Sequence, residues 1–187
     1  MLIIYGGSFN PPTKAHLELI NKLKESFSNA KIIIVPVAKS NYTWKDNLVD
    51  DSYRFAMLKL MFPDLEISDY ETKNLKYKGT YELLTYFKQF DSDIRFVIGS
   101  DNLSQMPLWL NYDNLIKDFK FICFKRPTDK IDLEVFKNYK DNLRVLEMDS
   151  KISSTKIREN LEKYRDWLIP SVYEYIKKNR LYEVEEC

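Results

Sequence analysis

The chain begins with a strand-like apolar run that ends in two glycines and leads directly into a helical pattern. Residues 2–5 read Leu-Ile-Ile-Tyr, Gly6 and Gly7 follow, and apolar side chains then recur at helical spacing between Lys14 and Phe27. Glycines let the backbone turn sharply and approach a ligand closely. The next helix offers unpaired N–H groups that favour an anion. This start predicts a strand–turn–helix unit with a phosphate cradle at its turn.

The rest of the chain continues to alternate short apolar runs with helical patterns, which is typical of a parallel sheet with right-handed crossovers. We therefore expect an α/β fold, a Rossmann-like doubly wound parallel sheet with helices on both faces. The expected strands are Leu2–Tyr5, Lys31–Val37, Leu65–Ser68, Ile94–Ile98, Lys120–Phe124 and Arg144–Met148. The expected helices are Lys14–Phe27, Asp51–Phe62, Thr80–Phe90, Tyr112–Phe119, Leu133–Tyr139, Ser154–Tyr164 and Ser171–Asn179.

Composition excludes several functional classes. The 187 residues are 44% hydrophobic and 30% charged, as in globular proteins, and the net charge of +1 provides no basic field for a nucleic-acid polymer. Cys123 and Cys187 lack metal-site spacing, which favours a reducing compartment. No apolar run reaches membrane-spanning length, and no signal peptide is recognisable. We expect a cytoplasmic protein without a membrane or nucleic-acid partner.

A second helix start near the other end of the chain has the same unusual chemistry as the first. Residues 152–158 read Ile-Ser-Ser-Thr-Lys-Ile-Arg, so hydroxyls suited to capping are followed by Lys156 and Arg158. Cations at a helix start oppose the helix dipole, as Lys14 and His16 do in the first helix. An ordinary capped surface helix is the alternative at each place. Taken together, the two starts predict two halves of one polyphosphate site.

The predicted topology brings these segments together. Ligands of open α/β sheets bind beyond the carboxyl ends of the strands, and residues 99–102, Gly-Ser-Asp-Asn, also follow a strand. Residues 6–16, 99–102 and 153–158 should therefore line one crevice. Their amides, hydroxyls, single imidazole, lysines and arginine suit a triphosphate. Such groups stabilise phosphoryl-transfer charge without a protein nucleophile.

Several of these segments resemble a known family. Residues 6–16, Gly-Gly-Ser-Phe-Asn-Pro-Pro-Thr-Lys-Ala-His, resemble the first nucleotidyltransferase signature in its Thr-x-x-His form, and residues 152–158 resemble the second. Residues 99–102 followed by Trp109, together with the tail at 170–182, resemble the nicotinate/nicotinamide mononucleotide adenylyltransferases in particular. The resemblance spans nearly the whole chain. It implies a single nucleotidyltransferase domain over residues 1–187, with a helical part from about 150 to 187.

The resemblance also implies a reaction and a set of site residues. AMP would pass from ATP to nicotinate mononucleotide, with Mg²⁺ bridging phosphate oxygens and no metal-ligating side-chain cluster. Catalysis is assigned to His16, Arg158 and Lys14. The implied ATP-binding residues are Gly7, Ser8, Phe9, Thr13, His16, Gly99, Asp101, Ile152, Ser153, Ser154, Thr155 and Arg158. The implied mononucleotide-binding residues are Gly6, Asn10, Lys45, Thr80 and Trp109.

Some alternatives stay open at this stage. A pantetheine-phosphate adenylyltransferase shares the Thr-x-x-His form, although residues 99–101, Trp109 and the long tail argue against it. A non-catalytic nucleotide-binding regulator of the same fold is disfavoured by the intact His16 and Arg158. Acceptor preference between nicotinate and nicotinamide is open, because the Tyr-Thr pattern common in relatives is absent near Thr80. Self-association into a homo-oligomer is also open. Arg54 and Glu71 are compatible with plain surface charges.

Overall fold

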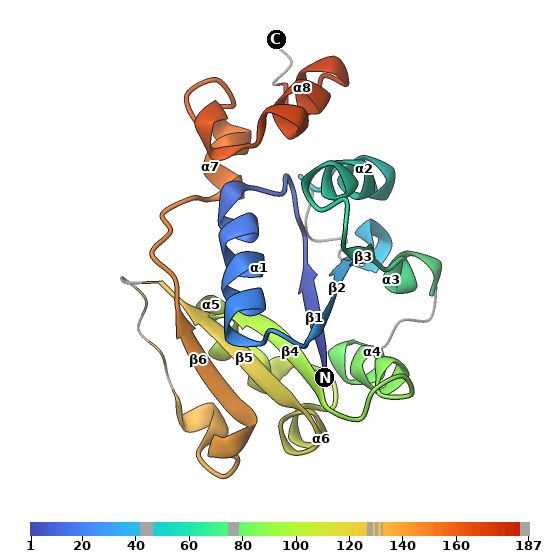
Figure 1. Ribbon diagram of the computed structural model, residues 1–187, viewed down its shortest axis with the longest axis vertical. Coiled ribbons are helices and arrows are strands. Elements are labelled where there is room, and N and C mark those ends of the chain that lie inside the picture. The colour runs from blue at the N-terminus through green and yellow to red at the C-terminus, as the bar shows by residue number, and fades with distance from the viewer. Residues whose placement is uncertain (42–46, 75–78, 127–128, 130, 132, 184–187) are drawn as a thin grey trace.

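A single parallel sheet organises the computed structural model, which describes residues 1–41, 47–74, 79–126, 129, 131 and 133–183 (Figure 1). The strands in spatial order are β3 (Glu66–Ile67), β2 (Lys31–Pro36), β1 (Leu2–Gly7), β4 (Ile94–Gly99), β5 (Lys120–Lys125) and β6 (Leu143–Glu147). Every neighbouring pair is parallel. This is the strand order of a doubly wound sheet, so the predicted fold class is confirmed.

Helices cover both faces of the sheet, and each face has its own hydrophobic core. One core joins the sheet to α1 (Lys14–Ser26), α2 (Asp51–Met61), α7 (Ser154–Glu159) and α8 (Pro170–Lys178). The other joins it to α4 (Thr80–Phe87), α6 (Tyr112–Asp118) and the 3-10 turn Leu133–Phe136. The short helices are α3 (Tyr70–Lys73) and α5 (Ser100–Leu103). The other 3-10 turns are Lys39–Asn41, Met106–Leu108, Lys140–Asn142 and Arg165–Trp167.

Strand β1 lies at the centre of the sheet because its side chains are apolar on both faces. Ile3 faces the α1 core and Ile4 faces the α4 core, and both are fully buried. Gly6 and Gly7 are still in register with Val35 and Pro36 of β2, so the glycine turn begins where the strand pairing ends. The turn is thereby held at the middle of the carboxyl edge of the sheet.

Two expected helices differ from the structure. Helix α7 ends at Glu159 rather than near Tyr164. Asn160 stops it, because its side-chain oxygen accepts a hydrogen bond from the backbone N–H of Lys163 at 2.9 Å and so replaces helical pairing. The segment expected to be helical over 133–139 forms only a 3-10 turn to Phe136. Phe136 is its buried residue, whereas Leu133 is largely exposed, so little apolar surface supports a longer helix.

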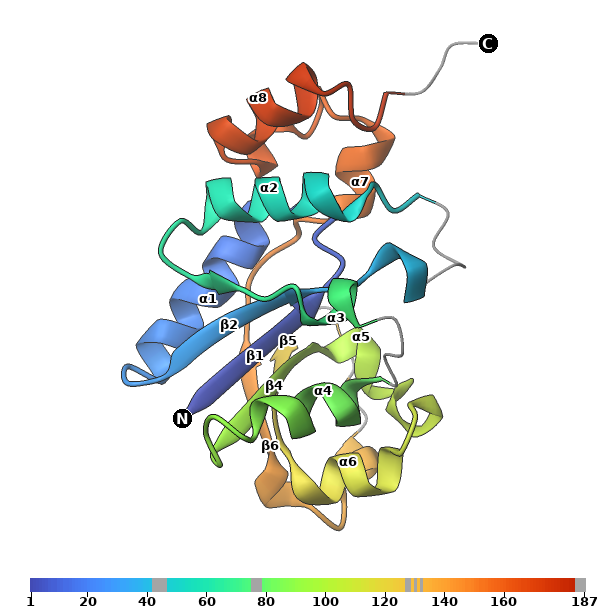
Figure 2. The same ribbon diagram turned by 90° about the vertical axis from the view of Figure 1, so that its right-hand side faces the viewer.

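The last helices stand together beyond the carboxyl ends of the central strands (Figure 1). Figure 2 shows α8 and α7 alongside α2 at this end of the molecule. Ile157, Val172 and Ile176 are fully buried in the core that also contains α1 and α2. The C-terminal helices therefore form one wall above the glycine turn. In the part of the chain that the structure describes, none of the helices has the length and apolar character needed to cross a membrane.

Candidate active site

Three adjoining cavities lie at the carboxyl edge of the sheet. The central cavity, of about 300 Å³, is bordered by Thr13, His16, Asp101 and residues 152–155. The tryptophan cavity, of about 720 Å³, is bordered by residues 6–8, Thr80 and Trp109. The arginine cavity, of about 510 Å³, is bordered by Lys39, Arg158 and Tyr182. Each of the three predicted segments, residues 6–16, 99–102 and 153–158, thus contributes residues to these neighbouring cavities.

Shared residues connect the cavities. Thr155 borders both the central and the arginine cavity. Tyr5, Gly99 and Asp101 border both the central and the tryptophan cavity. The three cavities are therefore neighbours at the carboxyl edge of the sheet.

His16 stands in the first turn of α1 with its ring fixed by its neighbours. Thr13 is the N-cap, and its backbone N–H donates to Nδ1 of His16 at 2.9 Å. The ring of Phe9 packs against the imidazole with centroids 5.2 Å apart. Burial, with a further contribution from the positive charge of Arg126, lowers the pKa of His16 to about 4. The imidazole is therefore neutral at pH 7, and Nε2 carries its proton.

Side chains approach the glycines of the crevice closely. A Cβ atom on Gly6 would lie 3.0 Å from the ring of Phe96, and one on Gly7 would lie 3.1 Å from the ring of Phe9. At Gly99, a Cβ would collide with the carboxylate of Asp101. Asp101 is thus folded back against β4, at the boundary between the central and tryptophan cavities.

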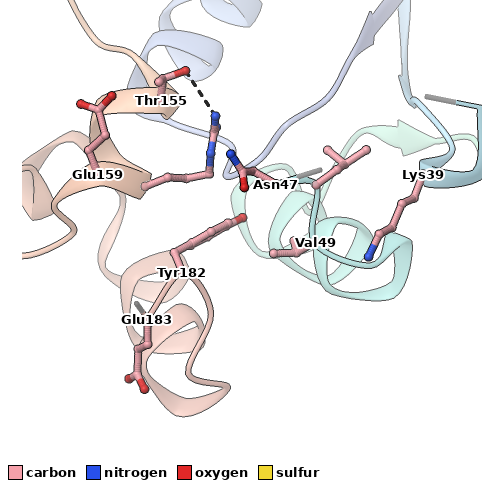
Figure 3. A pocket seen from close by; sticks show the side chains of 9 residues that line it. Lys39, Asn47, Val49, Thr155, Glu159, Tyr182 and Glu183 are labelled. Atoms are coloured by element: carbon pink, nitrogen blue, oxygen red, sulfur yellow. Dashed lines mark hydrogen bonds between the residues drawn. The ribbon is translucent and has the colours of Figure 1, made fainter. Parts of the chain in front are cut away.

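The second helix start is joined to the first by hydrogen bonds. The hydroxyl of Ser154 donates to the carbonyl oxygen of Pro11 at 2.9 Å. The guanidinium of Arg158 donates to the carbonyl oxygen of Asn10 at 2.7 Å and to the hydroxyl of Thr155 at 3.3 Å. Figure 3 draws the bond to Thr155 at the edge of the arginine cavity. The predicted pairing of the two helix starts is therefore present as direct contact.

Two sequence-predicted residues contact other parts of the protein, and a third is not among the described residues. The ammonium of Lys14 is exposed and donates to the carbonyl oxygen of Asp166 at 2.7 Å, away from the central cavity. The amide of Asn10 is buried; it donates to the carbonyl oxygen of Asn47 at 2.7 Å and accepts from the Tyr182 hydroxyl at 2.8 Å. Asn10 therefore joins protein segments. Lys45 lies outside the described residues.

The tryptophan cavity contains the other predicted acceptor residues. Thr80 opens α4 directly after Gly79, whose φ of 88° suits a glycine turn. The indole of Trp109 is half-buried and meets the ring of Phe96 edge-on, with centroids 6.4 Å apart. Thr80 and Trp109 face the same space as Gly6, so the structure brings these predicted residues together.

Sequence reasoning missed two polar groups of the central cavity. Arg126 and Asp129 border it directly after β5, and the backbone N–H of Arg126 donates to the Asp129 carboxylate at 3.2 Å. The hydroxyl of Ser100 also donates to Asp129, whose pKa is lowered chiefly by that bond. The sequence signal for both residues is topological. They follow β5, and ligands of such sheets bind beyond the carboxyl ends of the strands.

The expectation that Arg54 and Glu71 are surface charges is wrong. Arg54 has no exposed side-chain area, and Glu71 is 3% exposed. The guanidinium of Arg54 is surrounded by backbone carbonyl groups from three loops, described below. One Glu71 carboxylate oxygen accepts from the backbone N–H of Ala38 at 3.4 Å at the wall of the tryptophan cavity. Helical position alone cannot distinguish a buried from an exposed arginine, because the carbonyl groups that bury it come from elsewhere in the chain.

Comparison with known proteins supports the assignment of the fold and the family. The cytidylyltransferase-like family model matches residues 4–160. A protein named "Probable nicotinate-nucleotide adenylyltransferase" from Acholeplasma laidlawii is 38% identical over 186 residues, covering 98% of each chain. One of the same name from Clostridium tetani is 31% identical over 194 residues, covering 96% of this chain and 97% of the relative.

Solved structures share the fold. A Plasmodium falciparum nicotinic acid mononucleotide adenylyltransferase complexed with NaAD superimposes with a TM-score of 0.80 at 22% identity, covering 97% of this chain and 96% of the other. A structure of the Plasmodium enzyme with APC gives a TM-score of 0.79 at 23% identity.

A doubly wound sheet with a glycine cradle, an imidazole and a cationic helix start at its carboxyl edge defines an α/β protein of the nucleotide-binding class. The chain belongs to the cytidylyltransferase-like family, and both of the relatives above, matched over nearly their full length, are named "Probable nicotinate-nucleotide adenylyltransferase".

Proposed function

We propose that the protein transfers AMP from ATP to nicotinate mononucleotide, giving nicotinate adenine dinucleotide and pyrophosphate. The observation that carries this proposal is that three neighbouring cavities share lining residues, Asp101 between two of them and Thr155 between the next two. A site with adjacent spaces for a nucleoside, a second nucleotide and a pyrophosphate suits a reaction in which both substrates meet at one phosphorus atom. The names of the full-length relatives support the same acceptor class.

The cavities suggest how the substrates are arranged. Adenosine would occupy the central cavity, where the Asp101 carboxylate can accept bonds from the ribose hydroxyls. The acceptor nucleotide would occupy the tryptophan cavity, with its pyridine ring against Trp109. The β- and γ-phosphates would extend past Thr155 toward Arg158 in the arginine cavity. The α-phosphorus then lies where these spaces meet.

The chemistry is a direct displacement. An oxygen of the acceptor 5′-phosphate attacks the α-phosphorus of ATP, and the bond from that phosphorus to the bridging oxygen of the β-phosphate breaks. Pyrophosphate leaves with both electrons of that bond. Neutral His16 donates its Nε2–H to a phosphate oxygen, and Arg158 stabilises the charge that develops on pyrophosphate. No side chain forms a covalent intermediate.

ATP enters this scheme as its magnesium complex. Among the residues that the structure describes, no group of three or more His, Cys, Asp or Glu side chains is arranged to hold a metal ion. This donor set fits an ion that keeps phosphate oxygens and water as its ligands and arrives with the nucleotide. Arg126 lies at the central cavity and would add positive charge near the α-phosphate.

The test is an assay of the purified protein with ATP and Mg²⁺ in the presence of each candidate acceptor. Pyrophosphate and a dinucleotide should form together with nicotinate mononucleotide. Formation only with 4′-phosphopantetheine would instead identify a pantetheine-phosphate adenylyltransferase. ATP binding without pyrophosphate release from any acceptor would favour a non-catalytic regulator of the same fold.

A further inference from the structure

We infer that Arg54 is a positioning residue that sets the distance between the phosphate cradle and the segments on either side of residues 42–46. This inference rests on the proposed function for its kinetic consequence. Arg54 lies in the second turn of α2, and its side chain has no exposed area. It borders none of the three cavities, so it is separate from the proposed reacting groups.

The guanidinium binds three backbone carbonyl groups from three different loops. Nη1 donates to the oxygen of Ser8 at 2.9 Å, Nη2 to that of Val37 at 2.6 Å, and Nε to that of Val49 at 3.1 Å. Ser8 belongs to the cradle after β1, Val37 directly follows β2, and Val49 immediately precedes α2. A planar fork of five donors suits this task, and a lysine ammonium cannot reproduce its geometry.

Neighbouring hydrogen bonds also link the backbone segments that Arg54 contacts. The N–H of Val37 donates to the oxygen of Gly7 at 3.0 Å, so Val37 is linked to the cradle directly as well as through Arg54. Asp51 accepts a bond from Arg54 and another, at 2.9 Å, from the backbone N–H of Lys39. These bonds hold the backbone near Val37 and Lys39 and the backbone near Val49 to one buried cation.

The carbonyl groups that Arg54 binds lie behind the walls of two substrate cavities. Ser8 and Val37 border the tryptophan cavity, where the acceptor is proposed to bind. Val49 and Lys39 border the arginine cavity, as Figure 3 shows. The central cavity is bordered by other elements. Loss of the three-way contact should therefore disturb the acceptor more than the adenosine moiety of ATP.

The experiment compares Arg54→Lys and Arg54→Met with Met57→Ala. Met57 lies on the same helix with no exposed area and packs in the core, so its truncation lowers stability without touching the loops. In Arg54→Lys we expect the KM for nicotinate mononucleotide to rise about tenfold or more. The KM for ATP should also rise, because Val49 and Lys39 border the cavity proposed for its β- and γ-phosphates, whereas the affinity for AMP, which lacks those phosphates, should change less than about threefold. Met57→Ala should keep these constants near those of the unmodified protein at a matched temperature below its Tm.

A second measurement does not depend on activity. Backbone hydrogen exchange should accelerate in peptides covering residues 5–12 and 36–41 in Arg54→Lys, and should change little there in Met57→Ala. If the unmodified protein transfers no AMP, the proposed function fails and hydrogen exchange alone decides the role of Arg54.

The inference is overturned if folded Arg54→Lys has an unchanged acceptor KM and unchanged exchange, or if Met57→Ala gives the same pattern. If neither Arg54 variant folds, Asp51→Asn is tested in their place. Asp51 is paired with Arg54 and its own side chain is partly exposed, so this change weakens the contact that orients Arg54 without emptying a buried position. A rise of about threefold in acceptor KM with an unchanged affinity for AMP would then support the role, and an equal loss of affinity for AMP would overturn it.

Discussion

The Nδ1 atom of His16 accepts a hydrogen bond from the backbone N–H of Thr13 at 2.9 Å, within the same helical turn. The contact resembles a capping box in which an imidazole replaces the usual acidic or amide side chain. It commits the neutral ring to the tautomer with a proton on Nε2. The capping of α1 and the orientation of the proposed phosphate donor are therefore the same interaction.

His16→Ala should lower turnover far more than it weakens ATP binding. The imidazole is expected to interact most strongly with charge that develops in the transition state. Loss of one such donor costs about 3 kcal/mol, or roughly a hundredfold in kcat. Steady-state kinetics with ATP titration measures both constants. Near-normal turnover in a variant with an unchanged thermal melt would remove His16 from the mechanism.

Stability should decrease in acid because of His16. Its pKa of about 4 lies below the ordinary value of 6.5, so the unfolded chain binds the proton more readily. Stability from the neutral ring is complete above pH 6.5 and is lost as the pH falls toward 4. Between pH 7 and 4.5 this should cost about 1–3 kcal/mol. Urea unfolding of the protein and of His16→Asn provides the comparison, and equal losses in both would contradict the assignment.

Arg158→Ala should raise the KM for ATP and also slow turnover. The guanidinium borders the arginine cavity and holds the carbonyl oxygen of Asn10, so both phosphate affinity and cradle geometry depend on it. We expect at least about a tenfold loss in kcat/KM for ATP. Lys163→Ala is a suitable control, because that lysine is exposed further along the chain. Thermal melts are then recorded with and without ATP. If ATP raises the Tm of the variant as much as that of the unmodified protein, Arg158 has only a structural role in its helix.

Nicotinate mononucleotide should be preferred over nicotinamide mononucleotide by at least about tenfold in kcat/KM. A site that offers hydrogen-bond donors to the nicotinate carboxylate leaves one donor facing the NH₂ group when nicotinamide mononucleotide binds. The groups near the ring in the described structure include Thr80 and Trp109. The ratio is measured with matched Mg²⁺ and ATP. A ratio near one would indicate dual specificity, and one favouring the amide would reverse the assignment.

Trp109→Ala should impair both acceptors together, with roughly a threefold to tenfold rise in KM. Stacking reads the pyridine ring and is insensitive to whether its substituent is a carboxylate or an amide. The KM for ATP serves as the internal control. An effect confined to one acceptor would place the indole beside the substituent instead of the ring.

The sequence predicted the sheet well because its strands are continuous apolar runs and its helices have strong periodicity. Helices α3 and α5 are only four residues long, too short to show a period. The predicted crevice depended on topology alone, so Gly99, Asp101 and Ser153 could be placed together without coordinates.

Individual side-chain directions were harder to predict. Lys14 and Asn10 belong to recognisable motifs, yet the first donates to Asp166 and the second joins Asn47 to Tyr182. Arg54 is buried by carbonyl groups that are distant in sequence. These outcomes depend on long-range packing, which a local pattern of residues does not encode.

The bond between the Tyr182 hydroxyl and the amide of Asn10 joins groups 172 residues apart. During synthesis the cradle emerges from the ribosome before its partners on α7 and at Tyr182. At about 5–20 residues per second, the interval for 172 residues is on the order of ten to thirty-five seconds. The crevice can therefore close only after Tyr182 has been synthesised, and a chain truncated before Arg158 would lack the bonds that Arg158 and Tyr182 make to Asn10.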